Sequence, residues 1–140
     1  MYQFGLSVEV KTPQDVASWV EIVKRRDAYE RDPDKFWATW SGEEKKLRGR
    51  IQAARKLLPD VAIPDAVQEK AAALCLALKT DGLRGQLTLL RAARALASYD
   101  RRKTVELSHL RRMALPALRH RLRRNPLEDT GSVARVERTV

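Results

Sequence analysis

Apolar residues recur every three to four positions along most of the chain, which is the spacing of one face of an α-helix. Proline, glycine and acidic residues interrupt this pattern and separate the predicted helices from one another. Helices are expected at about residues 12–30, 33–40, 41–58, 63–78, 83–99 and 106–124. The sequence therefore predicts an all-α fold, a small helix bundle.

Local signals indicate where several of these helices begin or bend. Thr12 and Pro13 supply a capping hydroxyl and a proline at the first helical position, which favours a helix start there. Ser41 and Glu44 have the spacing of a capping box, so a new helix is expected to open at that point. Pro116 should kink the last helix, because proline lacks a backbone donor and crowds the preceding turn.

The first residues depart from the helical pattern. In residues 4–10, β-branched and polar side chains alternate after a glycine, which predicts a short strand. One strand cannot complete its own ladder of hydrogen bonds, so its partners are expected outside this chain or in another copy. Residues 125–140 have no clear period and are expected to end the chain loosely.

Length and composition limit the functional classes. A chain of 140 residues with 44% hydrophobic and 33% charged residues suits one folded domain and is too apolar for general disorder. It contains no apolar run long enough to span a membrane and no secretory signal pattern. The single cysteine, Cys75, cannot form an internal disulfide, so a reducing, cytoplasmic location is expected.

The basic charge is concentrated near the C-terminus. The net charge is +10, and residues 101–124 carry nine Lys or Arg against one acid. Such a segment is a candidate for nucleic-acid binding, but it lacks the interleaved aromatic residues that stack on bases. Arginines near a helix C-terminus also favour the helix dipole. Nucleic-acid binding is therefore kept as an alternative, and a structural or protein-facing role is preferred.

Several catalytic signals are absent from the sequence. It has no phosphate-binding GxxxxGK[ST] loop, no GxGxxG turn and no nucleophile elbow. His109 and His120 share one predicted helix but lie roughly 16 Å apart along it, too far to bind one metal ion. No metal site is expected, the histidines are interpreted as solvated or capping residues, and Cys75 is interpreted as a core residue.

The segment around Arg84 is the candidate site. Gly82 and Gly85 flank this arginine at the start of a predicted helix, where a guanidinium can project toward phosphate oxygens. Arg91 and Arg94 follow on or near the same face. They could extend a phosphate site or pair with acids on a neighbouring helix. From composition alone, a surface arginine near a turn remains the simpler interpretation.

Four segments resemble the I subunit of magnesium chelatase, an AAA+ ATPase, and its bacteriochlorophyll branch most of all. They are residues 4–10, 81–97, 120–127 and 131–139, and the motif Asp81-Gly-Leu-Arg-Gly-Gln-Leu-Thr-Leu-Leu-Arg91 is the specific one. The resemblance covers nearly the whole chain. The D subunit of the same enzyme and AAA+ ATPases of the methanol-dehydrogenase-regulator type are related alternatives.

The resemblance implies a C-terminal helical lid of a motor subunit. Residues 1–11 would be the terminal strand of an AAA+ core, 12–62 connecting helices, 63–124 the lid and 125–140 a tail. The parent would bind ATP with Mg²⁺, form a ring, expected to be a hexamer, and work with the D and H subunits to insert Mg²⁺ into protoporphyrin IX. Arg84 would be the sensor 2 arginine, which contacts the γ-phosphate in cis or in trans, with Gly82, Gly85 and Arg91 in support.

One departure from the family pattern limits what this chain is expected to do alone. The family places an Asp-Arg pair before Phe4-Gly5, whereas Tyr2 and Gln3 stand here, as at a truncation boundary. Without a phosphate loop the isolated chain is not expected to hydrolyse ATP. A basic nucleic-acid-binding domain and a purely structural oligomerisation module remain the alternatives.

Overall fold

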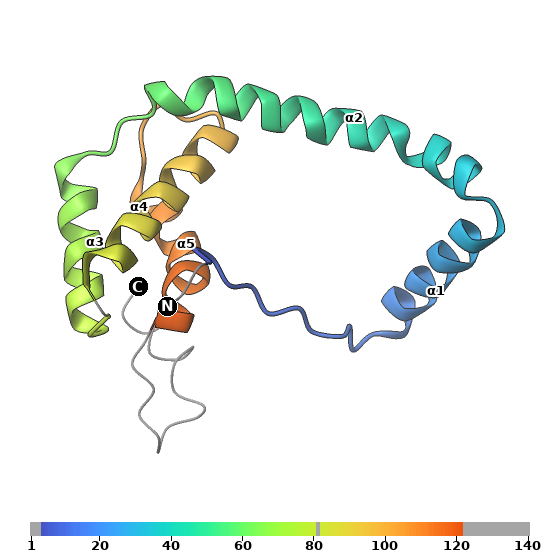
Figure 1. The fold of residues 1–140 in the computed structure, drawn as a ribbon, viewed down its shortest axis with the longest axis horizontal. Coiled ribbons are helices and arrows are strands. Elements are labelled where there is room, and N and C mark those ends of the chain that lie inside the picture. Colours follow the sequence, from blue (N-terminus) through green and yellow to red (C-terminus); the bar gives the residue numbers. More distant parts are fainter. Residues whose placement is uncertain (1–3, 81, 122–140) are drawn as a thin grey trace, which may run out of the picture. The chain divides into compact units, whose positions relative to one another are not determined.

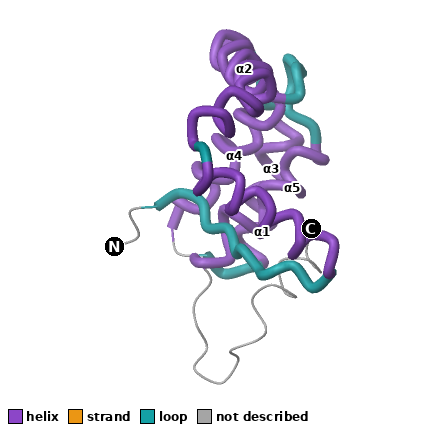
Figure 2. The backbone as a smooth tube through the Cα atoms, turned by 90° about the vertical axis from the view of Figure 1, so that its right-hand side faces the viewer, coloured by secondary structure: helices purple, strands orange, loops and turns teal. Residues whose placement is uncertain are grey.

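The computed structural model describes residues 4–80 and 82–121. The chain divides into two compact units, residues 9–52 and the remainder. Within the described residues every regular element is helical, as Figure 2 shows, and residues Ala62 and Thr104 form an isolated parallel bridge. The predicted all-α fold is confirmed.

Two long helices account for most of the first unit. Helix α1 covers Val16–Arg31, and α2 covers Pro33–Leu57, whose last turn belongs to the second unit. They leave the turn at Asp32 in different directions, as Figure 1 shows. Asp32 begins α2 by accepting a hydrogen bond on its carboxylate from the backbone N–H of Lys35, at 3.0 Å.

The second unit is a bundle of three helices. A 3₁₀ turn, η1, at Leu58–Asp60 leads to α3 at Asp65–Ala77, α4 at Gly82–Tyr99 and α5 at Leu107–Leu118, and a second 3₁₀ turn, η2, covers Arg119–Arg121. The three α-helices pack against one another (Figure 1). Their buried apolar residues form one core: Val61, Val67, Ala71, Leu74, Cys75, Leu78, Leu89, Leu90, Ala93, Ala97, Val105, Leu110, Ala114, Ala117 and Leu118.

Two loops close one end of this bundle. The backbone N–H of Ala62 donates to the carbonyl of Lys103 at 2.9 Å, and the N–H of Val105 donates to the carbonyl of Ala62 at 2.9 Å. Val61 and Val105, on either side of this bridge, are almost fully buried. The bridge therefore fixes the loop before α3 to the loop between α4 and α5.

The strand predicted at residues 4–10 is not seen in the structure. These residues have no regular secondary structure, and the described part of the chain offers no strand for them to pair with. Residues 4–8 instead lie against the end of α5, where the N–H of Ser7 donates to the carbonyl of Pro116 at 2.8 Å. Their backbone groups thus bond to a helix where a sheet ladder was expected.

Two predicted helix starts are wrong. The cap of α1 is Asp15, whose carboxylate accepts from the N–H of Ser18 at 2.7 Å, so the helix begins after Thr12 and Pro13. No helix opens at Ser41, because α2 is continuous and the Ser41 hydroxyl donates back to the carbonyl of Ala38 at 2.8 Å. The predicted helices at 33–40 and 41–58 are one helix.

The last helix ends earlier than predicted. Helix α5 stops at Leu118, and 3₁₀ geometry continues to Arg121. Residues 122–124 of the predicted helix and the predicted tail at 125–140 lie outside the described residues. None of the described helices combines the length and apolar character that a membrane span requires.

Candidate functional site

Helix α3 ends in a tight turn that leads into α4. Lys79 has a positive φ of 50°, and the N–H of Thr80 donates to the carbonyl of Cys75 at 3.1 Å. This is the Schellman arrangement, in which a left-handed residue satisfies the last carbonyls of a helix. The Thr80 side chain reinforces it with a second bond to the same carbonyl, at 3.3 Å.

Gly82 and Gly85 have different structural roles at the N-terminus of α4. Gly82 has a φ of +63°, a conformation that glycine adopts without strain. Gly85 is buried, and a Cβ placed there would meet Thr80 Oγ1 at 3.4 Å and Leu118 Cδ2 at 3.5 Å. Gly82 thus turns the chain into the helix, whereas at Gly85 the helix packs against the end of α3 and α5 at a distance that still leaves a methyl group ordinary contacts.

Arg84 lies between these glycines and is exposed. Leu83 and Leu87, on either side of it along the helix, are 76% and 50% exposed. The first N–H groups of a helix have no partners within it and carry the positive end of the helix dipole. A free guanidinium beside such an end can contact an anion such as a phosphate.

The other two arginines of the predicted face have separate environments. Arg91 is exposed two turns beyond Arg84, so it extends the same cationic face. Arg94 is partly buried, and its Nε donates to the carbonyl of Val61 at 2.8 Å, while Nη2 donates to the carbonyl of Pro59 at 3.3 Å. Arg94 therefore holds the η1 loop and is removed from the candidate site.

The predicted basic segment is partly committed to structural contacts. Arg112 Nη1 lies 2.8 Å from Asp100 Oδ2, which joins α5 to the end of α4. Arg121 donates from Nε to the carbonyl of Ala117 and from Nη2 to the carbonyl of Phe4, both at 3.2 Å. These contacts lower the number of arginines available for nucleic acid.

The two histidines have different structural roles. His109 is buried, and its Nδ1 accepts a hydrogen bond from the N–H of Glu106 at 2.9 Å, which completes a capping box at the start of α5. The prediction of a capping histidine is thus confirmed at His109. His120 is partly buried; desolvation and the adjacent charge of Arg121 lower its pKa, whereas a backbone contact with Phe4 raises it.

Cys75 belongs to the core, as predicted. Burial raises the pKa of its thiol, and this opposes thiolate formation. Among residues 4–80 and 82–121, no three side chains of the metal-binding types gather closely enough to hold an ion. The N-terminal part of α4 is therefore the candidate site that the described residues favour.

Comparison with known proteins places this helical unit in a family. The description "AAA lid domain" matches residues 68–139, about half of the chain. The chain belongs to the AAA lid domain family. The match begins in α3 and includes all of α4 and α5, so Arg84 and both flanking glycines lie within it.

Several curated relatives match this lid together with the preceding helices. The magnesium-chelatase 38 kDa subunit of Cereibacter sphaeroides is 56% identical over 99% of this chain, and that of Rhodobacter capsulatus is 51% identical over the same share. The magnesium-chelatase subunit ChlI of Anabaena variabilis is 37% identical over 97% of this chain. The chain spans about two fifths of the length of these relatives: 41%, 39% and 40%.

Proposed function

We propose that this AAA lid serves the ATP-driven motor subunit of a magnesium chelatase. The supporting observation is 56% identity to a magnesium-chelatase subunit over nearly all of the chain, including the segment around Arg84. In this proposal the parent protein binds ATP with Mg²⁺, assembles as a ring, expected to be a hexamer, and acts with the D and H subunits. Its ATP turnover drives Mg²⁺ insertion into protoporphyrin IX.

Arg84 is the residue proposed to couple the lid to the nucleotide. It stands exposed in the first turn of α4, where Gly82 turns the chain into the helix and Gly85 packs beside Thr80 at the end of α3. Within the part of the chain that the structure describes, Arg84 forms no ion pair. Its guanidinium can donate two parallel hydrogen bonds to the γ-phosphate, so it responds when that phosphate leaves. Arg91, on the same face, would add positive potential two turns away.

A chimeric protein tests this role. The present chain replaces the matching part of the Cereibacter sphaeroides 38 kDa subunit, and ATP hydrolysis and Mg²⁺ insertion are measured with the D and H subunits present. Arg84→Ala should reduce ATP turnover at least about tenfold, because transition-state charge on the phosphate loses its partner. Arg91→Ala should reduce it less.

Arg101→Ala is the matched control. Arg101 is also an exposed arginine at an end of α4, but it follows the C-terminus of the helix. Its removal changes the net charge equally and should leave ATP turnover within about twofold, since surface charges act weakly at a distance in salt. Equal loss in both variants, or normal turnover in Arg84→Ala, would contradict the proposed role.

A further inference from the structure

Helices α1 and α2 have a surface that nothing within their own unit covers. Neither helix contains a buried residue. Large apolar side chains on these helices are left open to solvent: Val16, Trp19, Val20, Ile22, Val23, Tyr29, Trp37, Leu47 and Ile51. Exposed apolar patches of this extent mark sites where another molecule binds.

A cluster of aromatic residues lies where the two helices meet. The rings of Tyr29 and Phe36 pack edge to face with centroids 5.6 Å apart, and those of Phe36 and Trp40 are 6.1 Å apart. The guanidinium of Arg25 covers the Trp40 ring at 4.5 Å, so α1 and α2 share this cluster. Such ring contacts keep the side chains in fixed positions.

Two hollows surround this cluster. One, of about 660 Å³, is lined by residues that include Phe36, Trp37, Trp40 and Leu47. The other, of about 430 Å³, lies between the helices near their turn and is lined by residues that include Ala28, Phe36 and Trp40. A third hollow, from Trp37 to Gln52, lies on another face of α2. We call the first two together the hairpin groove.

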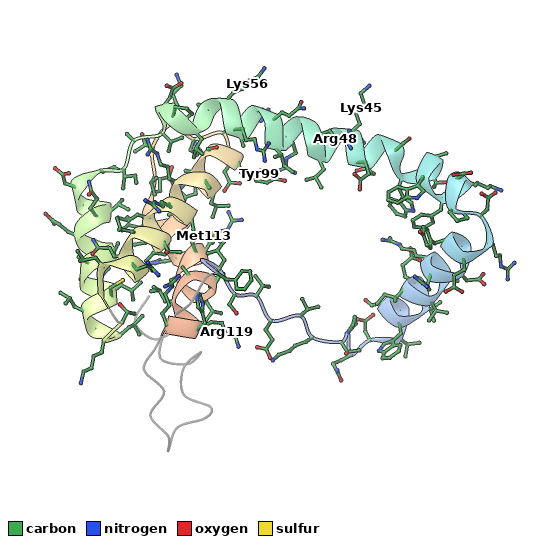
Figure 3. All side chains as sticks on the ribbon, viewed as in Figure 1. Lys45, Arg48, Lys56, Tyr99, Met113 and Arg119 are labelled. Carbon is green, nitrogen blue, oxygen red and sulfur yellow. The ribbon has the colours of Figure 1, made fainter. Side chains whose placement is uncertain are left out.

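The charge along the hairpin groove is net positive. Six cations and three acids line it: Lys24, Arg25, Arg31, Lys35, Lys46 and Arg50 against Asp32, Glu43 and Glu44. Figure 3 labels Lys45 and Arg48, which project from α2 and line the third hollow instead. Among the described residues, Lys24 and Lys35 form no ion pair, so an incoming acidic group would meet cations that are not yet neutralised.

We propose that the hairpin groove binds an acidic amphipathic helix of a partner protein. Aliphatic side chains of that helix would cover Trp37 and Leu47, and its carboxylates would face the lysines and arginines of the rim. This is the usual division of a helix-binding groove, in which apolar anchors give affinity and charges give orientation.

Two other occupants fit the groove less well. Single-stranded nucleic acid needs several aromatic ring faces for successive bases, but of the groove's aromatic residues only Trp37 is exposed. Phe36 and Trp40 are partly buried, and Arg25 already covers Trp40. A second copy of the hairpin would bring a mixed surface, because residues 9–52 contain ten Lys or Arg and nine Asp or Glu. The second copy therefore lacks the concentrated negative charge that the groove favours, and nucleic acid, although negatively charged, finds too few open ring faces for its bases.

A peptide titration with the 140-residue chain tests this proposal. The probe is a fluorescein-labelled amphipathic peptide of about 18 residues, five helical turns, with a leucine stripe flanked by glutamates. A second peptide carries glutamine in place of each glutamate. Fluorescence anisotropy should show binding of the acidic peptide at least about tenfold tighter than of the neutral one, with the difference reduced by added salt.

Three substitutions locate the binding on the groove. The double variant Lys24→Glu with Lys35→Glu should weaken acidic-peptide binding at least about tenfold, and Trp37→Ala should weaken both peptides. The control Lys56→Glu with Lys70→Glu makes the same charge change at exposed lysines that do not line the groove, and should leave affinity within about twofold. Circular dichroism checks that each variant keeps its helices.

Several results would overturn the proposal. They are no binding of the acidic peptide, equal binding of both peptides, equal effects of the two double variants, and tighter binding of a labelled oligo-dT strand than of the acidic peptide. Dimer formation in sedimentation velocity that is lost in Trp37→Ala would assign the groove to a second copy. Arg84 takes no part in any of these measurements, so their outcome is independent of the nucleotide-sensing role.

Discussion

At the scale of single residues, His109 at the start of α5 and His120 in η2 show that the position of a side chain decides its role. His109 is buried and caps the helix, whereas His120 lies between two arginines near the backbone of Phe4. In the sequence both histidines fall on the same face of one predicted helix, so their spacing alone predicts the same environment for both. His109 contacts Glu106, three residues before it, whereas His120 meets the backbone of Phe4, which is far away in the chain.

His120 should make stability depend on pH. Its pKa in the folded chain lies below the ordinary value of 6.5, chiefly because burial disfavours the charged form. The unfolded chain therefore binds the proton more readily, and stability is lost as the pH falls from 6.5 through the lower, folded-state pKa. Urea unfolding at a series of pH values should show this loss, and His120→Gln should reduce it. An unchanged pH profile in that variant would assign the loss to other groups.

Gly82 and Gly85 should respond differently to alanine. At Gly82 the φ of +63° makes any Cβ unfavourable, so Gly82→Ala should lower the free energy of unfolding by about 1–2 kcal/mol. At Gly85 the new methyl would meet its neighbours at 3.4 Å or more, and alanine gains up to about 1 kcal/mol of helix propensity. Gly85→Ala should therefore be neutral or slightly stabilising. Urea unfolding followed by circular dichroism compares the two, and equal losses would contradict the distinction.

At the scale of elements, Arg94 explains how α4 holds the η1 turn and the residue that follows it. Its guanidinium bonds the carbonyls of Val61 and Pro59, and Val61 is almost fully buried. Arg94→Ala leaves these carbonyls without their donors, so the free energy of unfolding should fall by about 2 kcal/mol. Arg91→Ala removes an exposed arginine of the same helix and should cost less than about 0.5 kcal/mol. Similar losses in thermal or urea unfolding would exclude the structural role of Arg94.

The sequence predicted some elements better than others, for physical reasons. Helices α3 and α4 were predicted within two residues of their observed ends, because proline and glycine interrupt an otherwise strong apolar pattern there. The capping box at Ser41 was wrong because an exposed helix accepts serine and glycine in its interior at a modest cost. Competition between a cap and continued helix depends on free-energy differences too small for a motif to resolve.

The candidate site illustrates the same limit. Sequence placed Arg84 at the start of a helix between two glycines, and it does lie there. Sequence also placed Arg94 with it, yet Arg94 turns to a loop more than thirty residues away in the chain. The groove on α1 and α2 was not predicted as a site. In the sequence, its regularly spaced apolar residues have the pattern of a helix face packed in a core, and only the structure shows that they are not buried. The functional role of Arg84 and the domain divisions stay predictions.

At the scale of the whole molecule, the two units should differ in local stability. The unit with α3, α4 and α5 contains the buried core, whereas α1 and α2 bury no residue. Local opening needs little free energy where few apolar contacts are lost. Amide hydrogen exchange followed by mass spectrometry should therefore be fast in residues 16–52 and slowest in α4 and α5.

If the proposed groove binds an acidic helix, the difference in local stability between the two units should become smaller. An acidic helix bound to α1 and α2 would stabilise the folded hairpin by mass action, by about 2.7 kcal/mol at a hundredfold excess over its dissociation constant. Exchange in residues 16–52 should then slow, while exchange in α4 and α5 stays at its original rate. Uniform protection of the free chain would contradict the difference in stability. If the acidic peptide slowed exchange only in the lid helices, the hairpin could not be its binding site.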